Sequence, residues 1–117
     1  MNDKKKNILN WKTIIILFSL STLISCSTVQ IGNDFKLETF TSHAELGKTT
    51  KDQVLSWLGK PMSSGISQKA DGERLDEWDY FYGTGQLPSM KDAKMKTLQI
   101  RFDKKGLLRS YNWTGSK

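Results

Sequence analysis

The sequence predicts an α+β fold, in which two short N-terminal helices pack on a three-stranded antiparallel β-sheet as a two-layer sandwich. Two helix-start patterns lie close together, at residues 42–45 and 50–53. Apolar and polar residues then alternate along residues 75–83 and 96–103, which is typical of half-buried antiparallel strands. Helices this short need a packing partner, and the apolar face of the sheet is the surface open to them. A short extra edge strand is compatible with this pattern.

The first helix is expected near residue 42. Ser42 and Glu45 fit a capping box, which predicts roughly one helical turn that ends at Gly47. Residues 26–41, which precede it, carry few structural signals and are expected to form a tether. This tether is too apolar for a pure spacer, so part of it docks either on the domain or on a partner. Its apolar residues are Val29, Ile31, Phe35, Leu37 and Phe40.

The second helix has clearer start and stop signals. Thr50 and Gln53 fit a second capping box, so a helix is expected to start just after Thr50. Gly59 supplies a left-handed stop, and Pro61 prevents the helix from continuing. One side of this helix is apolar and is expected to face the sheet. That stripe consists of Val54, Leu55 and Leu58, with Trp57 on its flank.

Three strands are expected along residues 75–83, 96–103 and 107–113. Asp71-Gly72 predicts a hairpin turn before the first of them, and residues 103–106 form a tight turn between the last two. Residues 83–93 contain glycine and proline and are expected to be a mobile loop, while residues 114–117 are expected to fray. The apolar faces are expected to carry Trp78, Tyr80, Tyr82, Leu98, Ile100 and Phe102.

The N-terminal residues have the pattern of a secretory signal peptide. Lysines cluster at residues 4–6 and recur at Lys12, and a mainly apolar run follows over residues 13–24. Such a run matches the apolar part of a signal, about 7–15 residues, and is shorter than the ~20 residues that cross a bilayer. Residues 1–25 are therefore predicted to be a signal peptide, with small Ser25 just before Cys26.

The run Leu23-Ile24-Ser25-Cys26 resembles the bacterial lipobox. The resemblance implies cleavage between Ser25 and Cys26, and covalent attachment of a diacylglycerol and an N-acyl chain such as palmitate to Cys26. Ser27 stands where an Asp commonly retains lipoproteins in the inner membrane, which implies sorting to the outer membrane. The alternative is an ordinary signal peptide, or a short membrane anchor, in which the cysteine is incidental.

The charge of the mature chain argues against nucleic acid as a partner. The full sequence has a formal net charge of +6, and removal of residues 1–25 takes away four lysines and one aspartate, which leaves +3. A charge this small, on an exported protein, does not indicate nucleic-acid binding. Cys26 is the only cysteine, so no disulfide stabilises the domain.

The residue types of an active site or a metal site are scarce. His43 is the only histidine and is expected to be an exposed helix residue, not a catalytic base or a metal ligand. The acidic residues within 71–79 are expected to form a solvated face of a strand rather than a calcium site. We therefore expect no enzyme activity, no metal and no cofactor apart from the lipid on Cys26.

Aromatic residues exceed what a small core needs. If two short helices cover only one face of the sheet, some aromatic rings should be exposed and should mark a protein interface. Tyr111 and Trp113 in the last strand are the predicted partner-binding residues. The alternative is that these rings complete the core.

Four segments together resemble the SmpA/OmlA, BamE-like, outer-membrane lipoprotein family. They are residues 47–54, Leu58-Gly59-Lys60-Pro61, Trp78-Asp79-Tyr80 and residues 98–108, within a domain at 42–113. The resemblance implies a lipid-anchored outer-membrane protein facing the periplasm. It also implies a non-catalytic scaffold or accessory role in β-barrel protein assembly and envelope integrity, with an envelope protein as partner. The alternative is a periplasmic binding or enzyme-inhibitor module of the same fold.

Overall fold

The computed structural model describes residues 26–115. The predicted signal peptide, with Ser25, and the last two residues of the predicted tail lie outside this range. Within residues 26–115, two helices and five strands follow one another along the chain. They are β1 Thr28–Gly32, α2 Leu37–His43, α3 Lys51–Leu58, β2 Ser63–Gln68, β3 Arg74–Gln86, β4 Lys91–Phe102 and β5 Leu108–Gly115.

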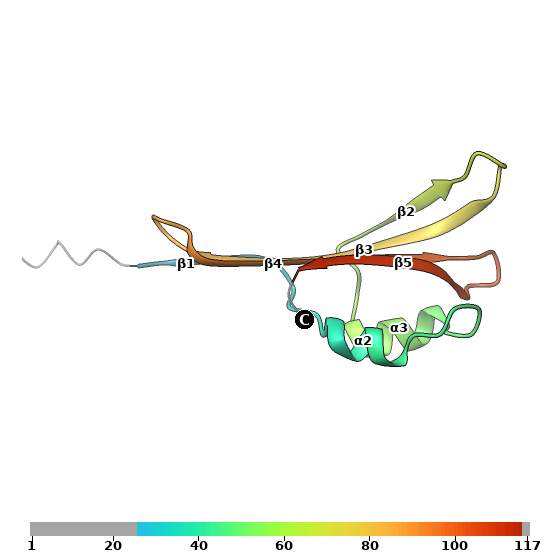
Figure 1. The fold of residues 1–117 in the computed structure, drawn as a ribbon, viewed down its shortest axis with the longest axis horizontal. Coiled ribbons are helices and arrows are strands. Elements are labelled where there is room, and N and C mark those ends of the chain that lie inside the picture. Colours follow the sequence, from blue (N-terminus) through green and yellow to red (C-terminus); the bar gives the residue numbers. More distant parts are fainter. Residues whose placement is uncertain (1–25, 116–117) are drawn as a thin grey trace, which may run out of the picture.

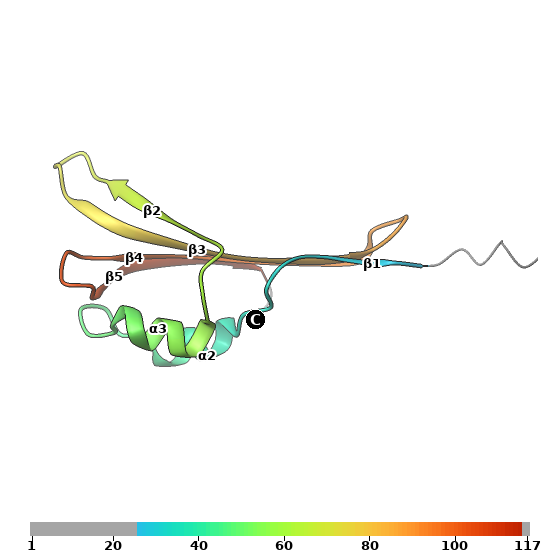
Figure 2. The ribbon, with the colours of Figure 1, turned by 180° about the vertical axis from the view of Figure 1, so that it is seen from behind.

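The strands form one antiparallel sheet in the order β1-β3-β4-β5, with β2 also paired to β3. β3 is long enough for both partners on the same edge, since β2 pairs with residues 74–79 and β1 with residues 82–86. Both helices lie on one face of the sheet, and the β2–β3 hairpin curls away on the other side (Figures 1 and 2). The α+β class is confirmed, but the described sheet has five strands rather than three.

The prediction of a mobile loop at residues 83–93 is wrong. β3 continues to Gln86 and β4 starts at Lys91, so a narrow turn at residues 87–90 joins them. Glycine suggested a loop in the sequence, but here Gly83 and Gly85 lie inside β3 between β4 and β1. A Cβ on Gly85 would lie 2.6 Å from the Met90 Cε atom, so the end of the Met90 side chain packs closely over this position.

The predicted capping box at Ser42 is also wrong, because α2 starts earlier, at Leu37. The Ser42 hydroxyl instead donates to the Glu38 carbonyl oxygen, 2.7 Å away, within the last turn of the helix. Leu37 and Phe40 are buried, and so is Phe35 just before the helix. Of the two alternatives for the apolar residues of 26–41, docking on the domain is therefore the one that the structure shows.

The predicted capping of α3 is confirmed. The Gln53 backbone amide donates to the Thr50 hydroxyl oxygen at 3.3 Å, and the Thr50 backbone amide donates to the Gln53 side-chain oxygen at 3.0 Å. Gly59 ends the helix with φ +77°. The apolar stripe needs one correction: Val54 is buried but Leu55 is 39% exposed. Leu55 is one residue from Val54, about 100° further around the helix, and so it turns away from the sheet.

The core lies between the two helices and the inward face of the sheet. Tyr80, Leu98, Ile100 and Phe102 are buried there, as their alternation predicts. The Tyr80 hydroxyl donates to the Gly59 carbonyl oxygen at 2.9 Å, so the end of α3 is held to the middle of the sheet. Burial raises the pKa of Tyr80 from 10.0 to about 12, because the charged phenolate would lose its hydration.

Candidate functional site

The face of the sheet opposite the helices carries a network of polar side chains from three strands. Arg101 Nε lies 2.7 Å from a Glu77 carboxylate oxygen, and Arg101 Nη2 donates to the Gln99 side-chain oxygen at 2.6 Å. The Gln99 amide donates to Asp79 at 3.0 Å, and the Ser63 hydroxyl donates to the same carboxylate at 3.1 Å. These contacts pair Arg101 with Glu77 and give the Asp79 carboxylate two neutral hydrogen-bond donors, so this half of the face is polar.

The other half of the same face is apolar. It forms a shallow groove of about 200 Å³ between β1, β3 and β4. Ile31 is 54% exposed, Met95 is 61% exposed and Met90 is 48% exposed. Exposed apolar side chains that lie together mark a contact surface more often than isolated ones do. We call this region the apolar groove, and it is lined by Val29, Ile31, Phe81, Gly83, Thr84, Gly85, Met90, Ala93, Lys94 and Met95.

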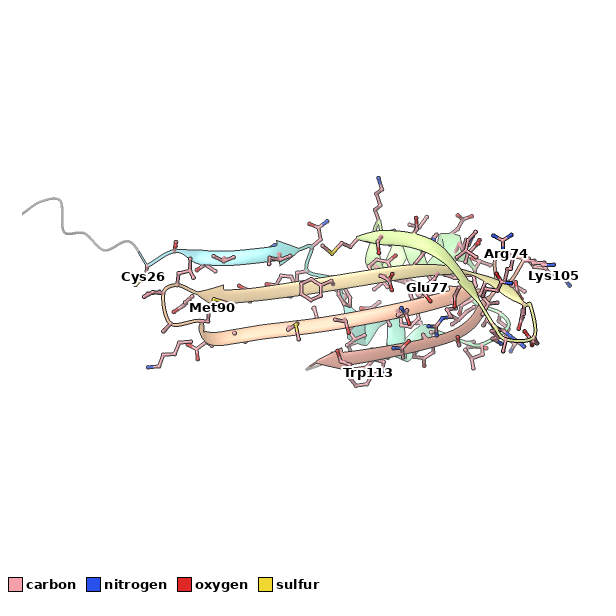
Figure 3. The ribbon with its side chains drawn as sticks, turned by 90° about the horizontal axis from the view of Figure 1, so that it is seen from above. Cys26, Arg74, Glu77, Met90, Lys105 and Trp113 are labelled. Carbon is pink, nitrogen blue, oxygen red and sulfur yellow. The ribbon has the colours of Figure 1, made fainter. Side chains whose placement is uncertain are left out.

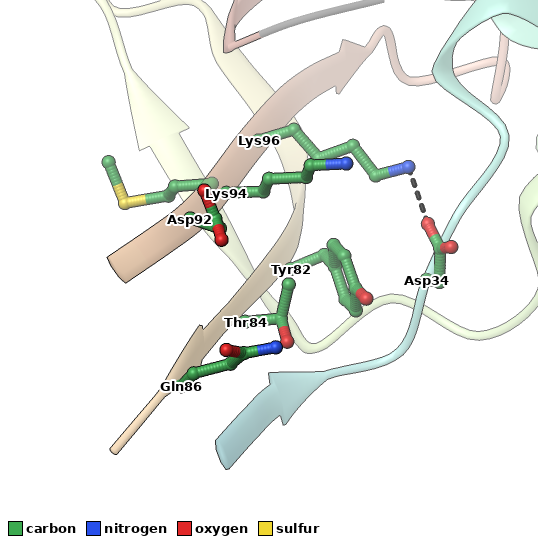
Figure 4. A pocket seen from close by; sticks show the side chains of 8 residues that line it. Asp34, Tyr82, Thr84, Gln86, Asp92, Lys94 and Lys96 are labelled. Carbon is green, nitrogen blue, oxygen red and sulfur yellow. Dashed lines mark ion pairs between the residues drawn. The ribbon is translucent and has the colours of Figure 1, made fainter. Parts of the chain in front are cut away.

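A larger pocket of about 430 Å³ lies beyond the helices, on their side of the sheet (Figure 4). Lys96 lines this pocket and forms two polar contacts there. Its Nζ atom lies 2.5 Å from an Asp34 carboxylate oxygen and donates to the Phe35 carbonyl oxygen at 2.6 Å. The same ammonium stands over the rings of Phe35 and Tyr82, at 4.9 and 5.3 Å from their centres. Lys96 therefore fastens the connection between β1 and α2 to the sheet.

The residues described by the structure contain no group of three His, Cys, Asp or Glu side chains that could hold a metal ion. His43 lies at the end of α2, where its Nδ1 atom is 2.8 Å from the Thr39 carbonyl oxygen and its ring centre is 5.7 Å from that of Trp57. Its contacts are thus those of a helix residue at the surface. None of the helices in residues 26–115 combines the length and the apolar character that crossing a membrane requires.

The predicted partner-binding residues Tyr111 and Trp113 lie on the helix side of β5, which is an edge strand of the described sheet. The Tyr111 ring stands perpendicular to the Phe40 ring, with 5.0 Å between ring centres. Both residues are half-buried and pack against the core. The structure thus brings the two together beside an open edge, and their role in binding a partner stays a prediction.

Cys26 is exposed two residues before β1, and it is far from Trp113. The next residue, Ser27, accepts a hydrogen bond at its carbonyl oxygen from the Leu87 amide, 3.0 Å away. Cys26 and Met90 therefore share one end of the molecule, and Arg74 and Lys105 lie at the other end (Figure 3). Attachment of lipid to Cys26 stays a prediction.

Sequence reasoning missed the apolar groove. Most of its residues come from the predicted tether and the predicted loop, which are distant in sequence and meet because β1 pairs with β3. A weak signal exists, because Val29 alternates with Ile31, and Ala93 alternates with Met95. That spacing of two is the period of a strand.

A comparison with protein families gives a match that covers most of this fold. The model of the outer membrane protein assembly factor BamE domain matches residues 42–112. The matched part contains α3 and strands β2 to β4 in full, together with most of β5, and it leaves out β1 and most of α2. No curated protein matches the chain. Because the match covers more than half of the sequence, the chain belongs to the BamE family of outer membrane protein assembly factors.

Proposed function

We propose that this chain is a lipid-anchored, non-catalytic accessory subunit of β-barrel protein assembly, on the periplasmic face of the outer membrane. The observation that carries the proposal is the BamE domain at residues 42–112, whose family acts in outer membrane protein assembly. The lipobox at Cys26 supplies the anchor. A shared fold alone does not transfer a function, so the proposal also needs a surface that can hold a partner.

The edge of β5 is the surface that suits a protein partner. The connection between α2 and α3 covers only the start of β5. There the Gly47 amide donates to the Leu108 carbonyl oxygen at 2.7 Å, and the Leu108 amide donates to the Thr49 carbonyl oxygen at 2.8 Å. Beyond this point, β5 pairs only with β4 in the described sheet. An edge of this kind can accept an added strand from another protein. Tyr111 and Trp113 beside it are of the residue type that concentrates binding energy at interfaces.

The anchor and the edge strand work together in this proposal. A lipid on Cys26 would confine the domain to the membrane surface, which raises the effective concentration of any partner that is held there too. The polar network between Glu77, Arg101 and Gln99 keeps β3 and β4 in a fixed arrangement, so β5 is presented on a rigid support. The subunit thus acts by holding a partner in place, and this requires no catalytic group.

Photo-crosslinking in cells tests the proposal. A photoreactive residue is placed at Asn112 on β5, and a matched one is placed at Asp52 on α3, since both positions are exposed. We expect a covalent adduct with an envelope protein from position 112 and none from position 52, and we expect co-purification with a barrel protein after mild detergent extraction. Adducts from position 52 alone would contradict the choice of surface. Capture of a periplasmic enzyme instead would favour the alternative of an inhibitor module.

Charge placed at the edge provides a second test that does not disturb the core. Ser110→Lys with Asn112→Lys should reduce co-purification of the partner, because charged side chains on an edge strand oppose the addition of another strand. Leu55→Lys with Ser56→Lys on the exposed side of α3 is the matched control and should leave co-purification unchanged. Equal recovery of the partner with both pairs would show that the edge of β5 is not the interface.

A further inference from the structure

The turn between β3 and β4 and the predicted lipid attachment site form one end of the molecule. The Leu87 amide donates to Ser27, the neighbour of Cys26, and Thr28 pairs with Gln86. Consecutive Cα atoms are about 3.8 Å apart, so the turn lies within roughly 10 Å of Cys26. Figure 3 shows Met90 at the same end of the molecule as Cys26. We call residues 87–90 the tip.

The tip and the apolar groove together expose several large apolar side chains. Leu87 is 41% exposed and Met90 is 48% exposed. Met90 also lines the groove with Ile31 and Met95, so the apolar surface continues from the tip along the helix-free face of the sheet. Lys91 follows the tip and is exposed. An apolar patch bordered by a lysine suits the boundary between acyl chains and lipid headgroups, where the ammonium can reach phosphates.

The N-terminal sequence favours a lipid bilayer, rather than a protein, as the partner of the apolar groove. Lipid on Cys26 would hold this residue at the membrane surface, and so would the apolar run 13–24 if it were retained as an anchor. The headgroup layer on each side of a bilayer is roughly 5–8 Å thick, as the difference between total and hydrocarbon thickness shows. The Leu87 end of the tip, within about 10 Å of the attachment point, can therefore reach this layer.

We propose that the tip and the adjoining apolar groove rest in the headgroup layer of the membrane, so that the protein contacts the bilayer through its fold as well as through its lipid. This inference rests on the proposed membrane anchoring at Cys26. It assigns the apolar groove to lipid and leaves the edge of β5 for the protein partner.

A fluorophore that senses its environment tests this contact. Ser89→Cys places a thiol at the tip, and Lys105→Cys places a matched one at the opposite end of the sheet. Lipid on Cys26 would consume its thiol, so each variant of the lipidated protein carries a single reactive cysteine. The labelled proteins are reconstituted in vesicles of phosphatidylethanolamine and phosphatidylglycerol, with and without nitroxide-labelled lipid. We expect blue-shifted emission and nitroxide quenching for the label at position 89, and neither for the label at position 105.

A second variant separates the tip from the anchor. Leu87→Asp with Met90→Asp, added to Ser89→Cys, should abolish the quenching, while the protein still floats with the vesicles through its lipid. Both residues are exposed, so the domain should keep its melting temperature.

Three results would overturn the inference, and they differ from failure of the proposed function. A protein that floats but whose label at position 89 is no more quenched than that at position 105 overturns the tip contact alone. Blue-shifted emission that rises with protein concentration and is not quenched by nitroxide lipid would assign the groove to a second copy. A protein that does not float overturns both the anchor and the tip contact. Loss of partner crosslinks from Asn112 bears on the proposed function and leaves the lipid contact standing.

Discussion

Gly32 ends β1 at a position that only glycine fits. Its φ is +76°, and a Cβ atom placed there would lie 2.0 Å from the Phe81 carbonyl oxygen. We expect Gly32→Ala to lower the free energy of unfolding by more than the roughly 1–2 kcal/mol that a left-handed backbone costs an L-residue, because the backbone of β3 must also move. Urea denaturation, followed by circular dichroism, measures this change.

Gly47 is the matched control for this prediction. Its φ of +78° is nearly the same, but no atom lies within 4 Å of the added Cβ. Gly47→Ala should therefore lose only the stability that a left-handed backbone costs, because no steric clash is added. If both variants lose the same stability, the close contact between β1 and β3 does not contribute. This contact matters for function because β1 carries Cys26 to the tip.

Tyr80 predicts how stability depends on pH. Its pKa is raised from 10.0 to about 12 by burial, so between these values the unfolded chain gives up a proton that the folded chain retains. The unfolded state then binds fewer protons, and the free energy of unfolding falls as pH rises through this window. The contribution is fully present below pH 10. Because Tyr80→Phe lacks this group, the stability difference between wild type and variant should be largest below pH 10 and should shrink toward pH 12.

The measurement compares denaturant unfolding of the two proteins at several pH values across that window. At lower pH, the variant should be less stable by about 0.5–1.5 kcal/mol, the usual contribution of one hydrogen bond, because the Gly59 carbonyl oxygen loses its donor. A difference that stays constant with pH would mean that the phenol is as hydrated in the folded protein as in the unfolded one.

At the scale of elements, α2 is the clearest departure from the sequence-based expectation. Phe40 is fully buried and its ring contacts those of Tyr111 and Trp57. Phe40→Ala should cost about 3–5 kcal/mol of unfolding free energy, as truncation of a buried phenylalanine usually does. Leu55→Ala in α3 should cost much less, since Leu55 is 39% exposed. Thermal or urea unfolding of both variants provides the check. A small loss of unfolding free energy in Phe40→Ala would mean that residues 37–43 do not pack on the domain and behave as a tether.

Local signals explain why some elements were predictable. The capping of α3 depends on Thr50 and Gln53, which are three residues apart, and its stop depends on Gly59 alone. The inward faces of β3 and β4 follow from alternation within each strand. β1 gives only a weak signal, the alternation of Val29 with Ile31, and its pairing partner on β3 lies far along the chain. Pairing between distant segments is not encoded in a short window of sequence, and so both β1 and the apolar groove were missed.

For the candidate site too, local sequence patterns indicate some features, and contacts between distant segments leave no such pattern. Cys26 is found from the residues immediately before it, because the lipobox is a local pattern. The sequence places Tyr111 and Trp113 in the last strand, but sequence alone could not show that Tyr111 packs on Phe40. The contact depends on where α2 starts. Since α2 lies earlier than its predicted cap, no sequence pattern could have related these two rings.

At the scale of the whole molecule, the long strand β3 would set the distance between the membrane and the far end of the domain once Cys26 is anchored as proposed. It contains 13 residues. At about 3.4 Å per residue, such a strand is roughly 40 Å long. The tip lies at one end of it, and Arg74 and Lys105 lie at the other end (Figure 3). An anchored tip would therefore let the sheet reach well into the periplasm, with the edge of β5 held between the membrane and the far end.

Cys26→Ser in the full chain should separate the fold from its location. Cys26 is exposed, so the purified variant should keep its melting temperature. Without the thiol no lipid can be attached, and we expect an unacylated, uncleaved precursor by mass spectrometry. Crosslinks from Asn112 should fall as well, because the domain loses the effective concentration that the lipid anchor provides. A free Cys26 thiol in the wild-type protein, or a wild-type chain that still starts at Met1, would contradict the anchor. Crosslinks that persist in the variant would instead show that the edge of β5 finds its partner without the lipid.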